Sequence, residues 1–296
     1  MTQNKTQQTD SPERVLQDLK PALETLGLCE MQKALERELC APSTEESRLQ
    51  WLWRLVEPQL HKRVEGRVER RIREARLPVR KTLFDFDFSF QPKLDRDLIL
   101  ELSTLRFLDQ GTNVLLAGMS GTGKSHIALA LGLLGCTHNR RVLYTTSADM
   151  LTRLTASLAD QTLTEQLKPY THAELLILDE VGLEQVERSE ARRAGLMQKV
   201  LLPRYNAQRA TIITSNIPWA SWGEYLDDHL GATALLDRLL HHSHVIVIDG
   251  PSYREWVHRQ ERTPCAGQAA AQARQSPEAA APKTAKPKRT GDKPQS

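Results

Sequence analysis

The residues best suited to chemistry form the stretch Gly118-Met-Ser-Gly-Thr-Gly-Lys-Ser125, which fits the phosphate-binding pattern G-x-x-x-x-G-K-[ST]. An apolar run at 113–117 precedes it and a helix-like run at 126–131 follows it, as a P-loop requires. In such loops the backbone N–H groups surround phosphates, the lysine reaches the outer phosphates and the hydroxyl binds Mg²⁺. The predicted nucleotide-binding residues are Gly118, Gly121, Thr122, Gly123, Lys124 and Ser125.

A second candidate stretch, Leu175-Leu-Ile-Leu-Asp179-Glu180, is an apolar run that ends in two acidic residues. A P-loop needs such a second site for its metal ion. Asp179, together with Ser125, is expected to hold the Mg²⁺, and Glu180 is placed to polarise a water for attack on the γ-phosphate. A solvated turn is the alternative interpretation of an Asp-Glu pair after a strand. A glutamate at this point favours hydrolysis of ATP over transfer of phosphate to a small acceptor.

A third polar segment, Thr214-Ser-Asn216, ends another apolar run. If the strand before the P-loop is central in the sheet, this segment lies beside the strand that ends in Asp179. Asn216 is then placed to orient the attacking water. Taken alone, an asparagine here is as often a turn residue as a catalytic one.

The elements that must position these residues follow from the apolar pattern. Short β-type runs recur at 113–117, 141–145, 174–179, 210–214 and 244–248, with amphipathic segments between them. Strands that are apolar on both faces and separated by helices indicate a parallel sheet covered on each side. We therefore predict an α/β fold, a P-loop core with a five-stranded parallel sheet, preceded by a small all-helical module.

The helical module is expected over residues 1–80. Its first helix begins near residue 10 and ends at Gly27, a second spans about 28–39, and a capping-box pattern at 43–46 begins a third. Leu77-Pro78 ends the pattern, because the residue before proline disfavours the helical conformation.

The remaining chain divides into a predicted ATPase domain, 81–262, and a tail, 263–296, which is too poor in large apolar residues to fold. At the start of the ATPase domain, residues 84–90 alternate phenylalanine with polar residues. This alternation predicts an extended segment that lays its rings on the following domain. Contact of a ring with a nucleotide base is the alternative.

Composition narrows the class of protein. The 296 residues are 40% hydrophobic and 26% charged, with a net charge of +3, as in an ordinary globular protein. Four scattered cysteines, without a C-x-x-C pair, argue against a zinc site and a disulfide framework. No apolar run is long enough to span a membrane and no secretory signal is evident, so we expect a cytoplasmic protein without a membrane partner.

Positive charge gathers between residues 62 and 80, where eight basic side chains face three acidic ones, a local charge of +5. Such a helix suits salt-sensitive, sequence-independent contacts with the phosphates of duplex DNA. The candidate contact residues are Arg63, Arg67, Arg70 and Arg71. The alternative is a solvated helix with internal pairing of Glu69 and Arg73.

Four stretches, GMSGTGKSHIALALG, LLILDEVG, RYNAQRATIITSNIPWASW and LLDRLLHHSHVIVIDGPSYR, together resemble the IstB family. These are ATP-binding helper proteins of bacterial insertion sequences, related to the DnaC helicase loaders, and the similarity spans about residues 11–258. The resemblance implies an AAA+ fold and an ATPase that forms homo-oligomers on DNA, with ATP sites at subunit interfaces. It also implies a partner transposase.

Further residue roles come from this resemblance alone. Asn216 resembles the sensor I residue, Arg238 the arginine finger that reaches a neighbouring subunit's ATP, and Arg254 the sensor II arginine. Met119 and Ser125 replace the proline and threonine that are usual in the family, and serine keeps the metal-binding hydroxyl. Three other functions stay open: a DnaC-like helicase loader, a non-catalytic DNA adaptor clamped by ATP and, least favoured, a metabolic kinase.

Overall fold

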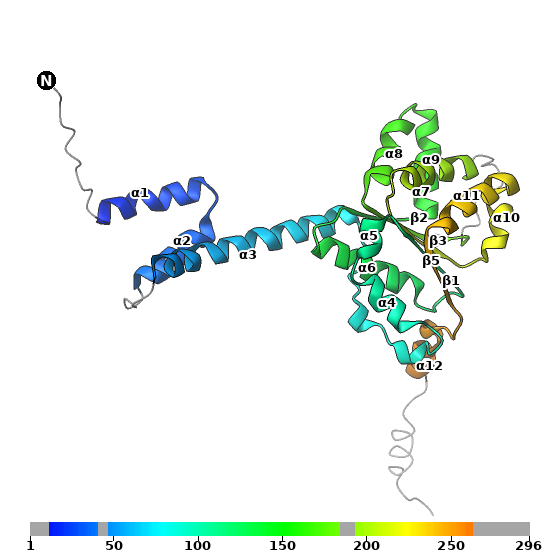
Figure 1. Cartoon of the computed structure of the whole chain (residues 1–296), viewed down its shortest axis with the longest axis horizontal. Coiled ribbons are helices and arrows are strands. Elements are labelled where there is room, and N and C mark those ends of the chain that lie inside the picture. Colours follow the sequence, from blue (N-terminus) through cyan, green and yellow to red (C-terminus); the bar gives the residue numbers. More distant parts are fainter. Residues whose placement is uncertain (1–11, 41–46, 184–192, 263–296) are drawn as a thin grey trace, which may run out of the picture. The chain divides into compact units, whose positions relative to one another are not determined.

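A computed structural model describes residues 12–40, 47–183 and 193–262, and Figure 1 labels their helices and most of their strands. The chain separates into two compact units, Met1–Ser252 and Tyr253–Ser296. The tail predicted at 263–296 lies outside the described residues, as does the predicted capping box at 43–46. None of the described helices is long and apolar enough to cross a membrane.

Three helices form the amino-terminal segment, as the sequence predicts: α1 (Pro12–Thr25), α2 (Cys29–Cys40) and α3 (Arg48–Ala75). A capping box begins α3, in which the Ser47 hydroxyl accepts from the Gln50 N–H (3.3 Å) and the Gln50 side chain accepts from the Ser47 N–H (3.1 Å). Arg76 ends α3 in the left-handed conformation, with φ at 57°. The helix therefore stops just before Leu77-Pro78.

A small core holds these helices together, with Leu23, Ala34, Leu35 and Leu55 buried in it. Gln59 of α3 lies beside this core, and its side-chain oxygen accepts from the N–H groups of Glu30 (3.0 Å) and Met31 (3.4 Å). The first N–H groups of a helix lack partners within the helix, so Gln59 satisfies the beginning of α2.

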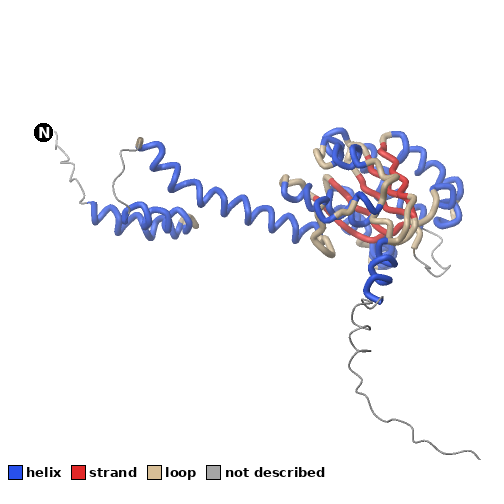
Figure 2. Tube along the Cα trace, turned by 90° about the horizontal axis from the view of Figure 1, so that it is seen from below, coloured by secondary structure: helices blue, strands red, loops and turns tan. Residues whose placement is uncertain are grey.

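The α/β core is built on five parallel strands in the order β2-β3-β4-β1-β5. Figure 2 shows the strands of this sheet in red, with helices around them. The strands are β1 (Asn113–Gly118), β2 (Val142–Thr146), β3 (Leu175–Val181), β4 (Thr211–Ser215) and β5 (Ser243–Ile248). The predicted five-stranded parallel sheet is therefore confirmed. Because β4 pairs with both β1 and β3, the segment after β4 reaches the same sheet edge as the P-loop and the end of β3.

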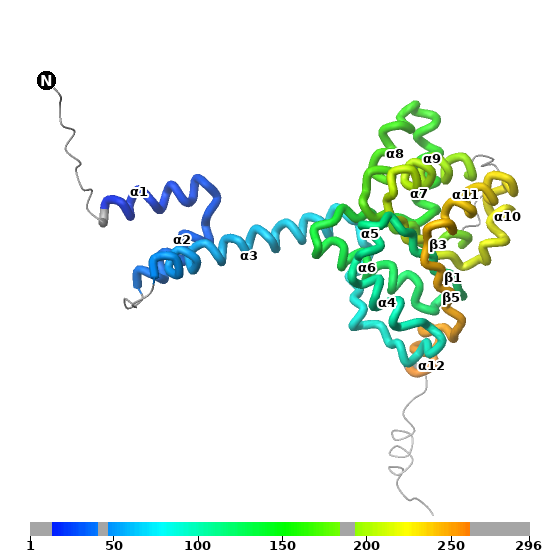
Figure 3. The backbone as a smooth tube through the Cα atoms, in the orientation of Figure 1, coloured from blue at the N-terminus to red at the C-terminus, as the bar shows by residue number. Residues whose placement is uncertain are grey.

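Helices connect and cover the strands. They are α4 (Arg96–Leu102), α5 (Arg106–Gln110), α6 (Lys124–Thr137), α7 (Ser147–Ala159), α8 (Leu163–His172), α9 (Arg193–Asn206), α10 (Trp222–Leu226) and α11 (His229–His241). The second unit contains the helix α12 (Tyr253–Arg262). One sheet face shares an apolar core with α4, α5, α6 and the end of α3, and the other with α7 to α11 (Figure 3). Both faces of the sheet are thus covered, as expected for strands that are apolar on both faces.

The phenylalanine-rich segment 84–90 is not extended, which corrects the sequence prediction. It forms two 3₁₀ turns, η1 (Leu83–Asp85) and η2 (Phe88–Phe90). The physical reason is that Asp85 accepts from the Thr82 N–H (3.2 Å) and Asp87 from the Ser89 N–H (2.9 Å), which closes the chain into turns.

The same segment does lay rings on the next domain, although not all of them. Phe86 is buried in the core beside α6 and Phe88 packs partly against it, whereas Phe84 is fully exposed. The alternation therefore predicted where some rings go but not the backbone conformation.

The buried side chain of Arg204, on α9, links this helix by hydrogen bonds to α8, to the residue after α8 and to the start of β4. The guanidinium of Arg204 (1% exposed) donates to the backbone oxygens of Tyr170 (2.7 Å) and Ala173 (2.8 Å) and to the Thr211 hydroxyl (3.0 Å). Burial lowers the pKa of this arginine to about 9, which still leaves it charged at neutral pH.

We expect Arg204→Leu to lower the free energy of unfolding by about 3 kcal/mol or more, because it leaves several buried acceptors unpaired. Urea denaturation followed by circular dichroism measures the change. Lys199→Leu, at an exposed position of the same helix, is the control and should shift stability by less than about 0.5 kcal/mol. A loss below about 1 kcal/mol for Arg204→Leu would mean that water replaces the guanidinium without strain.

Candidate functional site

The loop between β1 and α6 has the backbone that a phosphate cradle needs. Gly121 and Gly123 adopt φ values of 80° and 102°, a region that residues with a Cβ rarely enter. At Gly123 a Cβ would also lie 2.6 Å from Cε2 of Phe86, whose ring covers the start of α6. Phe86 is thus part of the loop's support, and sequence reasoning did not assign it this place.

Two side chains of the loop turn back onto its own carbonyl groups. The Lys124 ammonium, at a residue that is 5% exposed, donates to the backbone oxygens of Gly118 and Met119, both at 2.7 Å. The Thr122 hydroxyl also donates to the Met119 oxygen, at 2.9 Å. The lysine charge is therefore already held at the loop, where the phosphates of a nucleotide would lie.

Asp179, near the end of β3, is the centre of a buried hydrogen-bond cluster. The residue is 2% exposed, and three hydroxyl groups donate to its carboxylate. Ser125 reaches Oδ1 at 2.8 Å, Thr214 also donates to Oδ1, and Tyr144 reaches Oδ2 at 2.9 Å. The structure thus brings the two predicted metal-binding residues, Ser125 and Asp179, into direct contact.

Tyr144 and Thr214 are members of this cluster that the sequence analysis missed. Burial, and next the negative charge of Asp179, raise the pKa of the Tyr144 phenol above its ordinary value. Tyr144 therefore keeps its proton and remains a donor at neutral pH. The available signal was a phenol in the middle of a short β-type run, since a buried tyrosine hydroxyl needs a partner.

Glu180 lies where β3 becomes irregular. The pairing of β3 with β4 shifts between Leu178 and Val181, and Glu180 takes a left-handed φ of 62°. Thr214 Oγ1 accepts from its N–H (2.9 Å) and Ser147 Oγ donates to its carbonyl (3.4 Å). Such conformations are unfavourable by about 1–3 kcal/mol and need this kind of support.

The carboxylate of Glu180 is left available by this arrangement. Within residues 12–40, 47–183 and 193–262, it takes part in no hydrogen bond or ion pair. The residue is half-buried at the same sheet edge as Asp179. A carboxylate so placed can accept a proton from a water molecule beside the P-loop.

Asn216 follows β4 as predicted, beside β3. Its N–H donates to the Val181 oxygen at 3.3 Å, so it lies next to the segment that carries Glu180. The two arginines implied by the family resemblance lie elsewhere in the chain. Arg238 is exposed on α11, where it donates to the Ala234 oxygen of its own helix (2.9 Å), and Arg254 is exposed on α12, in the second unit.

The residues present fit a nucleotide with Mg²⁺. Magnesium prefers oxygen ligands and usually combines one or two carboxylates with phosphate oxygens and waters. Ser125 donates its only proton to Asp179, which leaves the hydroxyl's lone pairs for a cation. The glycine-rich backbone and Lys124 supply the complementary groups for phosphates.

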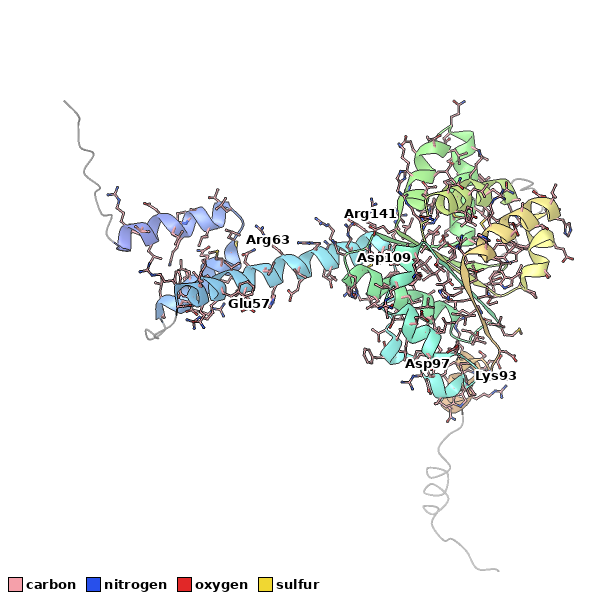
Figure 4. The ribbon with its side chains drawn as sticks, viewed as in Figure 1. Glu57, Arg63, Lys93, Asp97, Asp109 and Arg141 are labelled. Atoms are coloured by element: carbon pink, nitrogen blue, oxygen red, sulfur yellow. The ribbon has the colours of Figure 1, made fainter. Side chains whose placement is uncertain are left out.

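The four arginines of α3 that are predicted to contact DNA differ in exposure and in their contacts. Arg63, Arg67 and Arg70 are exposed, and Figure 4 labels Arg63 on α3. Arg71 is instead engaged in the fold, since it donates to Asn139, just beyond α6, and to Glu74, both at 3.2 Å. Of the four, Arg71 is the one whose removal would also disturb packing.

The alternative pairing of Glu69 with Arg73 is not what the structure contains. Glu69 accepts two hydrogen bonds from Arg80, at 2.7 and 3.1 Å, which lowers the pKa of the Glu69 carboxyl. Near its end α3 also buries Ile72 and Ala75 in the core that it shares with α6. The basic helix and the P-loop helix are therefore in contact.

Comparison with known proteins agrees with this geometry. The family model described as IstB-like ATP binding protein matches residues 21–261. An ATP-binding protein of insertion sequence IS21 from Pseudomonas aeruginosa is 43% identical over 187 residues, which cover 63% of this chain and 69% of that protein. One of insertion sequence IS232 from Bacillus thuringiensis subsp. berliner is 34% identical over 212 residues, covering 72% and 83%.

Solved structures include similar chains. The DnaC helicase loader is 22% identical with a TM-score of 0.43, and the match covers 52% of this chain and 89% of that one. DnaI is 24% identical with a TM-score of 0.47, and the match covers 57% and 91%.

Proposed function

Because this chain belongs to the IstB-like ATP-binding protein family, we propose that it is an ATP-dependent helper of transposition. In this proposal it oligomerises on duplex DNA, hydrolyses ATP and regulates or stimulates a partner transposase. The relatives are ATP-binding proteins of insertion sequences, which supports the assignment to transposition. Its DNA partner would require it to work in the compartment that holds the DNA, which for a bacterial insertion sequence is the cytoplasm.

One observation carries the proposal that ATP is hydrolysed. Ser125, at the end of the P-loop, donates a hydrogen bond to Asp179. Glu180, the next residue of β3, carries an available carboxylate. In this mechanism the N–H groups of Gly118, Gly121, Thr122 and Gly123 bind the phosphates and Lys124 neutralises their charge.

The remaining steps belong to four side chains. Ser125 and Asp179 would hold Mg²⁺, which would supply positive charge to neutralise the phosphates of the nucleotide. Glu180 accepts the proton of the attacking water. Asn216, beside β3, orients that water.

Oligomerisation is proposed from the position of Arg238. The side chain is exposed, and its bond is to its own helix, so it is available to a neighbouring molecule. An arginine supplied in trans neutralises charge that develops on the γ-phosphate during hydrolysis. Arg254 is proposed to contact the ATP of its own subunit, as the family resemblance implies.

Phosphate release and assembly on DNA test this function together. The protein should release phosphate from ATP in the presence of Mg²⁺ and duplex DNA, and should form large assemblies on DNA with a non-hydrolysable ATP analogue. Co-purification with the transposase of the same element, and not with a hexameric replicative helicase, separates a transposition helper from a helicase loader. Assembly without any phosphate release would instead identify a non-catalytic clamp.

DNA binding through α3 predicts a specific dependence on salt. Replacing Arg63, Arg67 and Arg70 by alanine should reduce the slope of log K against log salt by about 0.9 for each lost phosphate contact. Fluorescence anisotropy of a labelled duplex, titrated at several salt concentrations, measures this slope. Arg71 is left in place because it contacts Asn139 and Glu74.

A matched control removes the same charge elsewhere. Arg106, Lys168 and Lys199 are exposed on helices α5, α8 and α9, and their replacement by alanine should leave the slope within about 0.5 of its starting value. Equal slopes for both triple variants would exclude α3 from the DNA-binding surface.

A further inference from the structure

We propose that Tyr144 is a positioning residue for the metal-binding carboxylate, its hydroxyl fixing Oδ2 of Asp179 so that Oδ1 stays directed at Ser125. The inference rests on the proposed function, because it assigns Asp179 and Ser125 to Mg²⁺. It extends that function by adding a residue of β2, a strand to which no role in the nucleotide site has been given.

The hydrogen bonds around Asp179 show why one more donor matters. Oδ1 receives two donors, Ser125 at the start of α6 and Thr214 on β4. Oδ2 accepts a hydrogen bond from the Tyr144 hydroxyl, and no other described residue donates to it. A carboxylate turns about its Cβ–Cγ bond as one planar group, so the Tyr144 donor on Oδ2 adds to the resistance that the donors on Oδ1 give to this rotation.

The sheet register explains why a tyrosine can do this. Thr146 is the register partner of Asp179, and Tyr144 lies two residues earlier on β2 and therefore on the same face. A long, rigid side chain is needed to span that diagonal. The Tyr144 ring is itself held, because it packs against the core that contains Val142, Ile72 and Ile177.

Outer partners of this kind influence metal binding without touching the metal. Residues that orient a ligand by a hydrogen bond typically change metal affinity about 10–100-fold when they are removed. Tyr144→Phe deletes only the hydroxyl and keeps the packed ring. We expect it to weaken metal binding to the nucleotide complex about tenfold while affinity for ATP without metal stays unchanged.

The experiment measures metal binding directly and does not depend on turnover. Mn²⁺ is titrated into the full-length protein saturated with a non-hydrolysable ATP analogue, and free Mn²⁺ is followed by electron paramagnetic resonance. ATP affinity in EDTA is measured in parallel. Tyr170→Phe is the matched control, because Tyr170 is a buried tyrosine that packs in the core on the other face of the sheet.

The outcomes separate this inference from the proposed function. If the unaltered protein binds neither the analogue nor Mn²⁺, the proposed function fails. If it binds both and Tyr144→Phe has the same Mn²⁺ affinity, or a tighter one, only the role of Tyr144 fails. A loss of thermal stability with unchanged Mn²⁺ affinity also overturns the role, because it shows a purely structural residue.

A double-variant comparison gives a second test. If Tyr144 acts through Asp179, adding Tyr144→Phe to Asp179→Asn should weaken Mn²⁺ binding by less than twofold beyond Asp179→Asn alone, the non-additivity expected of residues in direct contact. A full tenfold further loss would contradict action through Asp179. Should Tyr144→Phe not fold, Tyr144→Met keeps an apolar side chain there and carries the same expectation.

Discussion

Arg238→Ala should lower the turnover number for ATP at least about 1000-fold and leave the ATP dissociation constant within about twofold of the unaltered protein. The side chain is exposed, and among the described residues its hydrogen bond is to the Ala234 oxygen of its own helix, so removing it disturbs little within the subunit. Its proposed target is the γ-phosphate in a neighbouring subunit, where an arginine stabilises charge that develops in the transition state. Phosphate release and equilibrium binding of a fluorescent ATP analogue, both with duplex DNA present, measure the two quantities.

Mixing two inactive variants tests whether the site is shared. Lys124→Ala subunits lack the lysine for the phosphates but carry Arg238, and Arg238→Ala subunits bind ATP but lack the arginine. An equal mixture should recover up to roughly a quarter of full turnover. With head-to-tail contacts, about one site in four joins the intact P-loop of an Arg238→Ala subunit to the arginine of a Lys124→Ala neighbour. No recovery, with mixed assemblies shown to form, would contradict a site between subunits. Arg106→Ala, at an exposed position on α5, should keep full turnover.

Glu180→Gln should lower turnover about 100- to 10,000-fold while ATP binding and assembly on DNA persist. Glutamine keeps the size of the side chain, and the backbone bonds to Thr214 and Ser147 stay available. What is lost is the ability to accept a proton from water. Single-turnover phosphate release measures the chemical step, and binding of the ATP analogue measures the first step.

Two comparisons give this prediction its specificity. Glu224→Gln removes an exposed carboxylate from α10 and should leave turnover unchanged. The Glu180→Gln protein should accumulate as an ATP-bound assembly on DNA, visible as slower dissociation from a labelled duplex. Turnover within about tenfold of the unaltered protein would show that another group activates the water.

The loop and strand ends that form the candidate nucleotide site could be located from the sequence in large part because their signals are local. The P-loop needs its glycines, Lys124 and Ser125 within eight residues, and both flanking elements are adjacent in the chain. The five strands could also be predicted from the sequence, since strands covered on both faces are continuous apolar runs. The phenylalanine-rich segment was less so, because the local hydrogen bonds of Asp85 and Asp87 override the alternating pattern.

By itself, then, the sequence determined the P-loop, the acidic pair near the end of β3, the number of strands and the three amino-terminal helices. Only the tertiary structure decided that Tyr144 and Thr214 donate to Asp179, each from a position 35 residues away in the chain. It also decided that Glu180 takes a left-handed backbone conformation and that Arg71 is drawn into contacts with Asn139 and Glu74. The physical reason is that short-range patterns reflect backbone preferences and burial, whereas partners across a sheet depend on strand order and register, which form only when the whole core packs.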